Sequence, residues 1–161
     1  MQTRATSDAS LREQLVRALA WESAHINLES AASRIPGDWI GRKAEGIPYT
    51  PWQLLEHIRL TQRDILDFCT DPDYEEPRWP DAYWPAEDAP ADPGAWQRSV
   101  EQSVEDRAAF ADLIADPKLD LFATIPHGEG QTYLREALLI LDHSAYHVGQ
   151  LIVLWRLLGG S

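Results

Sequence analysis

The chain has 161 residues, of which 44% are hydrophobic and 25% charged, the size and composition of one globular domain. Its formal net charge of −12 argues against nucleic acid or an anionic membrane surface as a partner, because phosphate contacts need clustered Lys and Arg. No uninterrupted apolar run reaches the roughly 20 residues of a membrane span, and the single cysteine, Cys69, cannot form an internal disulfide. We therefore expect a cytoplasmic protein.

Apolar residues at helical spacing predict a first helix over about residues 7–33. Ser7 or Asp8 can serve as its N-cap, and Ile35-Pro36-Gly37 ends it. His25 lies near one edge of the apolar stripe.

A second helix is expected from Pro51 to about Thr70. Thr50 is its N-cap, Pro51 occupies the first helical position, and Gln53 can complete a capping box. The next segment, 71–92, carries five prolines and cannot be helical. Its aromatic residues predict an ordered loop that lies across apolar surface; they are Tyr74, Trp79, Tyr83 and Trp84.

Asp92-Pro93 predicts the cap and first turn of a third helix, which ends near Asp116-Pro117. After a connector over 118–131, Thr132 caps a fourth helix that runs to Leu157 or Leu158 and stops at Gly159-Gly160. This last helix is apolar on most sides, as is typical of a central helix. The sequence thus predicts an all-α fold, a four-helix bundle with long ordered connecting loops, as a single domain over 1–161. Bundles of this kind bind metals or ligands between facing helices.

Polar residues interrupt the apolar surface of two of these helices. His143 and His147 are four residues apart, so they lie on one helical face together with Glu136 and Gln150. His57 stands among apolar residues of the second helix. Buried polar groups cost several kcal/mol unless they are satisfied. Three converging imidazoles would form an open, catalytic type of metal site, although a single buried histidine can also be a hydrogen-bonded core residue.

Several sharper motifs do not fit. Ser144 follows His143, so the H-E-x-x-H metalloprotease motif and its general base are missing. A di-iron bundle needs Glu-x-x-His twice, and the spacing occurs once, as Glu22-Ser23-Ala24-His25. His25 at a helix edge and His127 in a loop are weaker ligand candidates than the other three histidines.

Three stretches carry a family resemblance: Pro51-Trp52-Gln53-Leu54-Leu55-Glu56-His57-Ile58, Gly130-Gln131-Thr132-Tyr133-Leu134-Arg135-Glu136-Ala137-Leu138 and Asp142-His143-Ser144-Ala145-Tyr146-His147-Val148-Gly149-Gln150. Through them the chain resembles the DinB/YfiT-like superfamily, with similarity that also extends through His25 and the Tyr83-Trp84-Pro85 loop. The resemblance implies a four-helix bundle, often dimeric, that holds a divalent metal ion, Ni or Zn above all. It places the ligands at His57, His143 and His147.

These observations predict a metal-dependent enzyme acting on a small electrophilic molecule, either as a thiol-dependent S-transferase or as a hydrolase. The superfamily's characterised branches include thiol-dependent S-transferases and a mycothiol-dependent isomerase, and no residue selects among them. The alternatives are a metal- or ligand-binding bundle without turnover and a purely structural module. No catalytic residue is assigned. The candidates for the pocket or for orienting the ligands are His25, Thr61, Asp64, Glu136 and Gln150.

Overall fold

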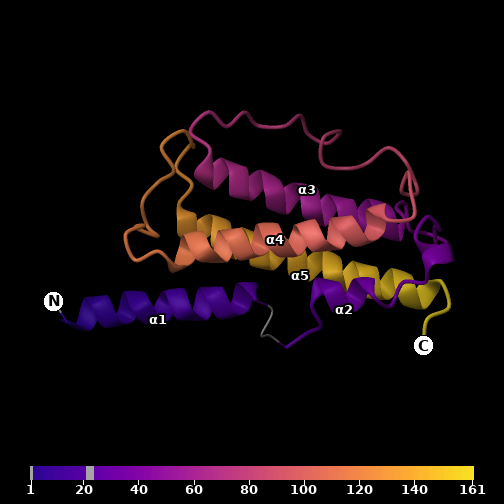
Figure 1. Cartoon of the computed structure of the whole chain (residues 1–161), viewed down its shortest axis with the longest axis horizontal. Helices are drawn as coiled ribbons and strands as arrows, with labels where there is room; N and C mark the ends of the chain where they lie inside the picture. Colours follow the sequence, from indigo (N-terminus) through magenta and orange to yellow (C-terminus); the bar gives the residue numbers. More distant parts are fainter. Residues whose placement is uncertain (1, 21–23) are drawn as a thin grey trace.

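The computed structural model describes residues 2–20 and 24–161, and it confirms the all-α fold. In chain order the helices are α1 (Gln2–Leu19), α2 (Leu28–Ala32), the 3-10 helix η1 (Gly37–Trp39), α3 (Pro51–Thr70), α4 (Ala95–Ala115) and α5 (Tyr133–Leu157). In Figure 1, α3, α4 and α5 run side by side, and α1 and α2 follow one another along the lower edge of the bundle. The described part of the chain contains no strand, only one isolated β-bridge between Thr124 and Thr132.

The first predicted helix was wrong as a single element. It is divided into α1 and α2, and only part of the break, residues 20 and 24–27, is described. Asn27 explains the restart, because its side chain accepts a hydrogen bond from the backbone N–H of Ser30 and so caps α2. His25 consequently lies in the connection before α2 and not on a helix edge.

The start of the second predicted helix, α3, was correct in detail. Thr50 accepts a hydrogen bond from the Gln53 N–H, and the Gln53 side chain accepts one from the Thr50 N–H, so the capping box is complete. Thr132 caps α5 through the Arg135 N–H. The predicted cap of α4 was wrong. Asp92 does not cap the helix; Gly94 is the N-cap, and Asp92 accepts from the Gly94 N–H in the preceding turn.

The core consists of two apolar clusters joined by a more polar middle layer. One cluster packs Leu19 of α1 with Ile65, Phe110 and Ile140, and the other packs α2 with the opposite ends of α3 and α5. Along α5, His143, Ser144 and His147 lie between Ile140 of the first cluster and Val148 of the second. The candidate site therefore lies where the apolar core is interrupted.

Of the helices in the described residues, α5 alone has the length and apolar composition that a membrane span would need. Core helices of soluble proteins meet the same criterion, and α5 packs against each of the other four α-helices.

Candidate metal centre

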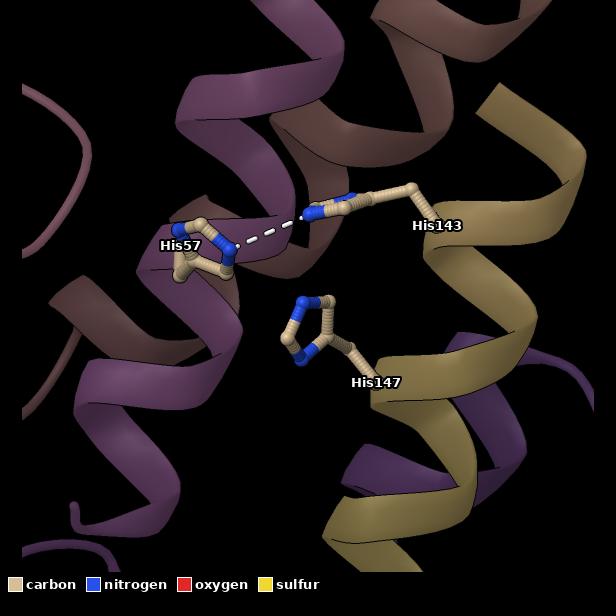
Figure 2. A group of neighbouring side chains, drawn as sticks. All are labelled: His57, His143 and His147. Atoms are coloured by element: carbon tan, nitrogen blue, oxygen red, sulfur yellow. Dashed lines mark hydrogen bonds between the residues drawn. The ribbon is translucent and has the colours of Figure 1, made fainter. Parts of the chain in front are cut away.

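Three histidines from two facing helices meet in the middle of the bundle. His57 comes from α3, and His143 and His147 come from successive turns of α5. Figure 2 shows the three imidazoles pointing toward one another across the space between the helices. One ring nitrogen from each lies within 4.8 Å of the others. His57 and His147 are buried and His143 is half-buried, so the cluster is most open at His143.

The hydrogen bonds of the outer ring nitrogens define how His57 and His147 are oriented. His57 Nδ1 lies 3.0 Å from the backbone oxygen of Tyr83, which can only accept, so Nδ1 carries the proton and Nε2 keeps its lone pair. His147 Nδ1 donates in the same way to Gln150 Oε1 at 2.7 Å. His57 Nε2 lies 3.1 Å from His143 Nε2 (Figure 2). Both oriented rings thus present Nε2 for ligation.

Burial keeps the three imidazoles neutral. Burial, with a smaller contribution from neighbouring imidazoles, lowers the pKa of His57 to about 4, against a raising contribution from its hydrogen bond to Tyr83. The same two causes lower the pKa of His143 to about 3. Burial also lowers the pKa of His147, against a raising contribution from its hydrogen bond to Gln150. Neutral imidazole is the form that binds a metal ion, so near neutral pH no proton has to leave these groups before they can do so.

The 71–92 segment supplies an aromatic cover that the sequence did not assign to the site. Trp84 stacks on the His57 imidazole with ring centroids 3.8 Å apart and planes 9° apart. Tyr49 stacks on Trp84 at 5.7 Å. Exposed Trp79 lies 6.5 Å from the His57 ring. Trp84 and the carbonyl of Tyr83 thus contact His57 from two directions. In the sequence, the only sign of these contacts was the Tyr83-Trp84-Pro85 run in a proline-rich loop.

Asp64 fastens this segment to α3. Its two carboxylate oxygens accept hydrogen bonds from the hydroxyls of Tyr74 and Tyr83, each at 2.8 Å. Burial raises the pKa of both tyrosines, and the Asp64 carboxylate raises it further, so both hydroxyls remain donors. Asp64 is linked to His57 through Tyr83, whose hydroxyl bonds the carboxylate and whose backbone oxygen accepts from the imidazole.

Three of the other predicted pocket residues have their contacts away from the imidazole rings. The Thr61 hydroxyl donates to the backbone oxygen of His57 at 2.8 Å. Glu136 is buried and pairs with Arg135 at 2.7 Å, nearly two turns before His143 on α5. His25 is exposed and lines a different cleft, beside Gly149 and Trp155. Of the five candidates, only Gln150 has a hydrogen bond with one of the three imidazoles.

The donor set fits a divalent metal ion. Nitrogen ligands of zinc lie about 2.0–2.1 Å from the ion, so two of them in tetrahedral arrangement are roughly 3.3 Å apart. The observed 3.1 Å between the Nε2 atoms of His57 and His143 is close to this separation. Imidazole suits Zn and Ni alike. Fold and site together define a helical bundle with a three-histidine group able to hold one ion.

The chain belongs to the DinB superfamily, whose family model matches residues 20–151. The resemblance seen in the sequence is thereby confirmed. No curated protein and no solved structure matches the chain.

Proposed function

We propose that this protein is a metal-dependent enzyme that binds one divalent ion, Ni or Zn, through His57, His143 and His147. The observation that carries the proposal is the orientation of the rings. His57 and His147 each donate Nδ1–H to a fixed oxygen, which leaves both Nε2 atoms free to bind the same ion.

An ion held there would supply Lewis-acid chemistry, lowering the pKa of a water or low-molecular-weight thiol that reaches it. Groups of the protein itself orient the imidazoles and shield one of them from water. The Tyr83 carbonyl and Gln150 hold the protons of two imidazoles at Nδ1. Trp84 covers one face of His57 and keeps water from it. His143 is only half-buried, and we propose that the entering molecules reach the ion from its side.

We further propose that the substrate is a small electrophilic molecule, attacked by a thiol in an S-transferase reaction or by water in a hydrolysis. Three protein ligands leave a coordination position for water or substrate, as in catalytic zinc sites. No side chain of the chain is assigned as a general base.

A metal-binding protein without turnover is the second candidate. One observation favours it: among the described residues, no carboxylate hydrogen-bonds to any of the three imidazoles. General acid–base catalysis needs a group within hydrogen-bond reach of the proton that it transfers. An assay of the metal-loaded protein with a thiol and an electrophile decides between the two: turnover favours the enzyme, and its absence favours the metal-binding protein.

The metal proposal is tested by elemental analysis of protein purified without an affinity tag. We expect about one ion per chain in the wild type and its loss in His143→Ala. His127→Ala is the matched control, because His127 is a loop histidine that packs on Phe68 and lies outside the cluster. Metal well below one ion per chain that His143→Ala leaves unchanged would overturn the proposal.

We also propose that the protein forms a homodimer through α5 and works in the cytoplasm. Four of the large hydrophobic side chains that are exposed in the described residues lie on this one helix; they are Leu138, Tyr146, Val153 and Leu157. Exposed apolar side chains that gather on one helix in this way support an interface with another chain.

A further inference from the structure

We propose a second ligand site, separate from the metal centre: a cleft between α2 and α5 that binds a small amphipathic anion, an aromatic or aliphatic body with one acidic group. The cleft has a volume of about 470 Å³, within the usual range for small-molecule sites. It is lined by residues of the α2 region and by one face of α5.

The floor of the cleft is apolar. Ile26 lies on one side, and Val148, Ile152 and Trp155 of α5 form the other. The α5 face that lines the cleft is not the face that carries the histidines, because Gly149 lies about 160° around the helix from His147 at 100° per residue. A ligand here would bury its apolar body without touching the three imidazoles.

The polar groups of the cleft are basic. Arg34, Arg156 and His25 line it, and no carboxylate of the described residues does. This is a local excess of positive charge in a chain of net charge −12. Neither arginine forms a salt bridge with a carboxylate of the described residues. The Arg34 guanidinium lies over the Trp155 ring, 5.3 Å from its centroid, which holds the charge beside the apolar floor.

Gly149 provides an independent sign that the cleft is kept open. It lies in the interior of α5, where glycine destabilises a helix relative to alanine. Its φ is not positive, and a Cβ built on it would meet nothing within 4 Å. Neither backbone conformation nor close packing requires glycine here. The structural consequence of the missing side chain is space in the cleft.

A second copy of this chain is a less suitable occupant. In a two-fold dimer the same surface meets itself, so a contact centred on this cleft would bring Arg34 and Arg156 toward the same arginines of the other copy. Like charges so placed repel one another. An anionic ligand instead pairs with these guanidinium groups, which bind carboxylates and similar anions through paired hydrogen bonds.

The test uses two fluorescent probes with similar ring systems. The anionic probe is 8-anilinonaphthalene-1-sulfonate and the neutral one is N-phenyl-1-naphthylamine, which lacks the sulfonate. We expect the sulfonate to bind one per folded chain and about tenfold or more tighter than the neutral probe, from one charge-assisted contact. Its affinity should be the same with and without added zinc, so this proposal and the metal proposal can fail separately.

Substitutions in the cleft test whether the probes bind there. Arg34→Gln combined with Arg156→Gln should weaken sulfonate binding about tenfold or more and leave the neutral probe unaffected. Arg42→Gln is the matched control, because Arg42 lies over Trp39 outside the cleft. Gly149→Leu should abolish binding of both probes, whereas Gly149→Ala should raise the melting temperature and retain binding. Equal affinity for the two probes, wild-type sulfonate binding in the double arginine variant, or a Gly149→Leu variant that changes oligomeric state and not probe binding would each overturn the proposal.

Discussion

Replacing Trp84 tests whether the aromatic cover sets the metal affinity of the site. The indole lies flat on the His57 imidazole, 3.8 Å between centroids and 9° between planes. Trp84→Leu keeps an apolar side chain but removes the flat face, and Trp84→Phe keeps a smaller flat face. Neither change touches the hydrogen bond from His57 Nδ1 to the Tyr83 carbonyl.

The size of the effect follows from the stack. An aromatic pair contributes about 0.5–1.5 kcal/mol beyond the area that it buries. When the stack is lost, the His57 ring keeps only its hydrogen bond to the Tyr83 carbonyl, and the free energy needed to complete its ordering is taken from metal binding. Since about 1.4 kcal/mol is a factor of ten in affinity, Trp84→Leu should weaken zinc binding roughly 2- to 12-fold. Trp84→Phe should weaken it less.

The assay is competition for zinc against a chelating indicator, with untagged protein at neutral pH. A second pair of proteins carries His57→Ala with and without Trp84→Leu. If Trp84 acts through His57, the Trp84 effect disappears in that background, because the two substitutions remove the same interaction. Wild-type affinity in Trp84→Leu, or an equal loss of affinity in both backgrounds, would refute the reasoning.

Four further outcomes are expected. Asp64→Asn should lower both the melting temperature and the zinc affinity, since one amide oxygen replaces the two carboxylate oxygens that accept from the tyrosine hydroxyls. Equal zinc affinity in wild type and variant would show that anchoring the loop at Asp64 does not affect the metal site. In the metal-free protein, the pKa values of His57 and His143, about 4 and about 3, lie below the ordinary value of about 6.5. The unfolded chain therefore takes up more protons than the folded chain as the pH falls. The free energy of unfolding measured with urea should keep its full value above pH ~6.5 and decrease as the pH falls toward the pKa values of the two histidines in the folded protein. Val153→Glu should convert the proposed dimer to a monomer, as measured by light scattering. A wild-type protein that is monomeric at high concentration would contradict the proposed dimer. Cys69 should react with a thiol reagent only after unfolding, because burial raises the pKa of its thiol to about 12.

The sequence predicted the elements whose signals are local. Thr50, Pro51 and Gln53 specify the start of α3 within four residues, and the structure has the cap as predicted. The histidine pair of α5 needs only the helical repeat to share a face. That His57 meets this pair depends on α3 and α5 packing together, which long apolar helices of one bundle favour.

Contacts made by the 71–92 loop could not be predicted, because they depend on the path of a segment without repeating structure. Prolines predicted a loop, and aromatics predicted that it would be ordered. Which atoms reach His57 is decided by the anchoring of Tyr83 to Asp64, a contact across 19 positions of sequence. Backbone oxygens are present at every residue, so no pattern of side chains can single out the Tyr83 carbonyl as the acceptor.

The helix-edge position predicted for His25 was wrong because the apolar period of the first predicted helix continues in the sequence past the residue where α1 ends. Ile26 follows Leu15 and Leu19 at helical spacing, so the apolar period read from the sequence extends past the end of α1. Leu28, which is buried in α2, lies about 180° from Leu19 at 100° per residue and does not belong to that stripe. The signal that opposed a continuous helix was Asn27, a strong N-cap residue followed by a buried leucine. Once the helix ends before His25, the imidazole is no longer carried toward the bundle interior, and it lies beside the cleft of α2 and α5. A cap signal inside a long periodic stretch should therefore be given more weight than the period when the position of a histidine depends on it.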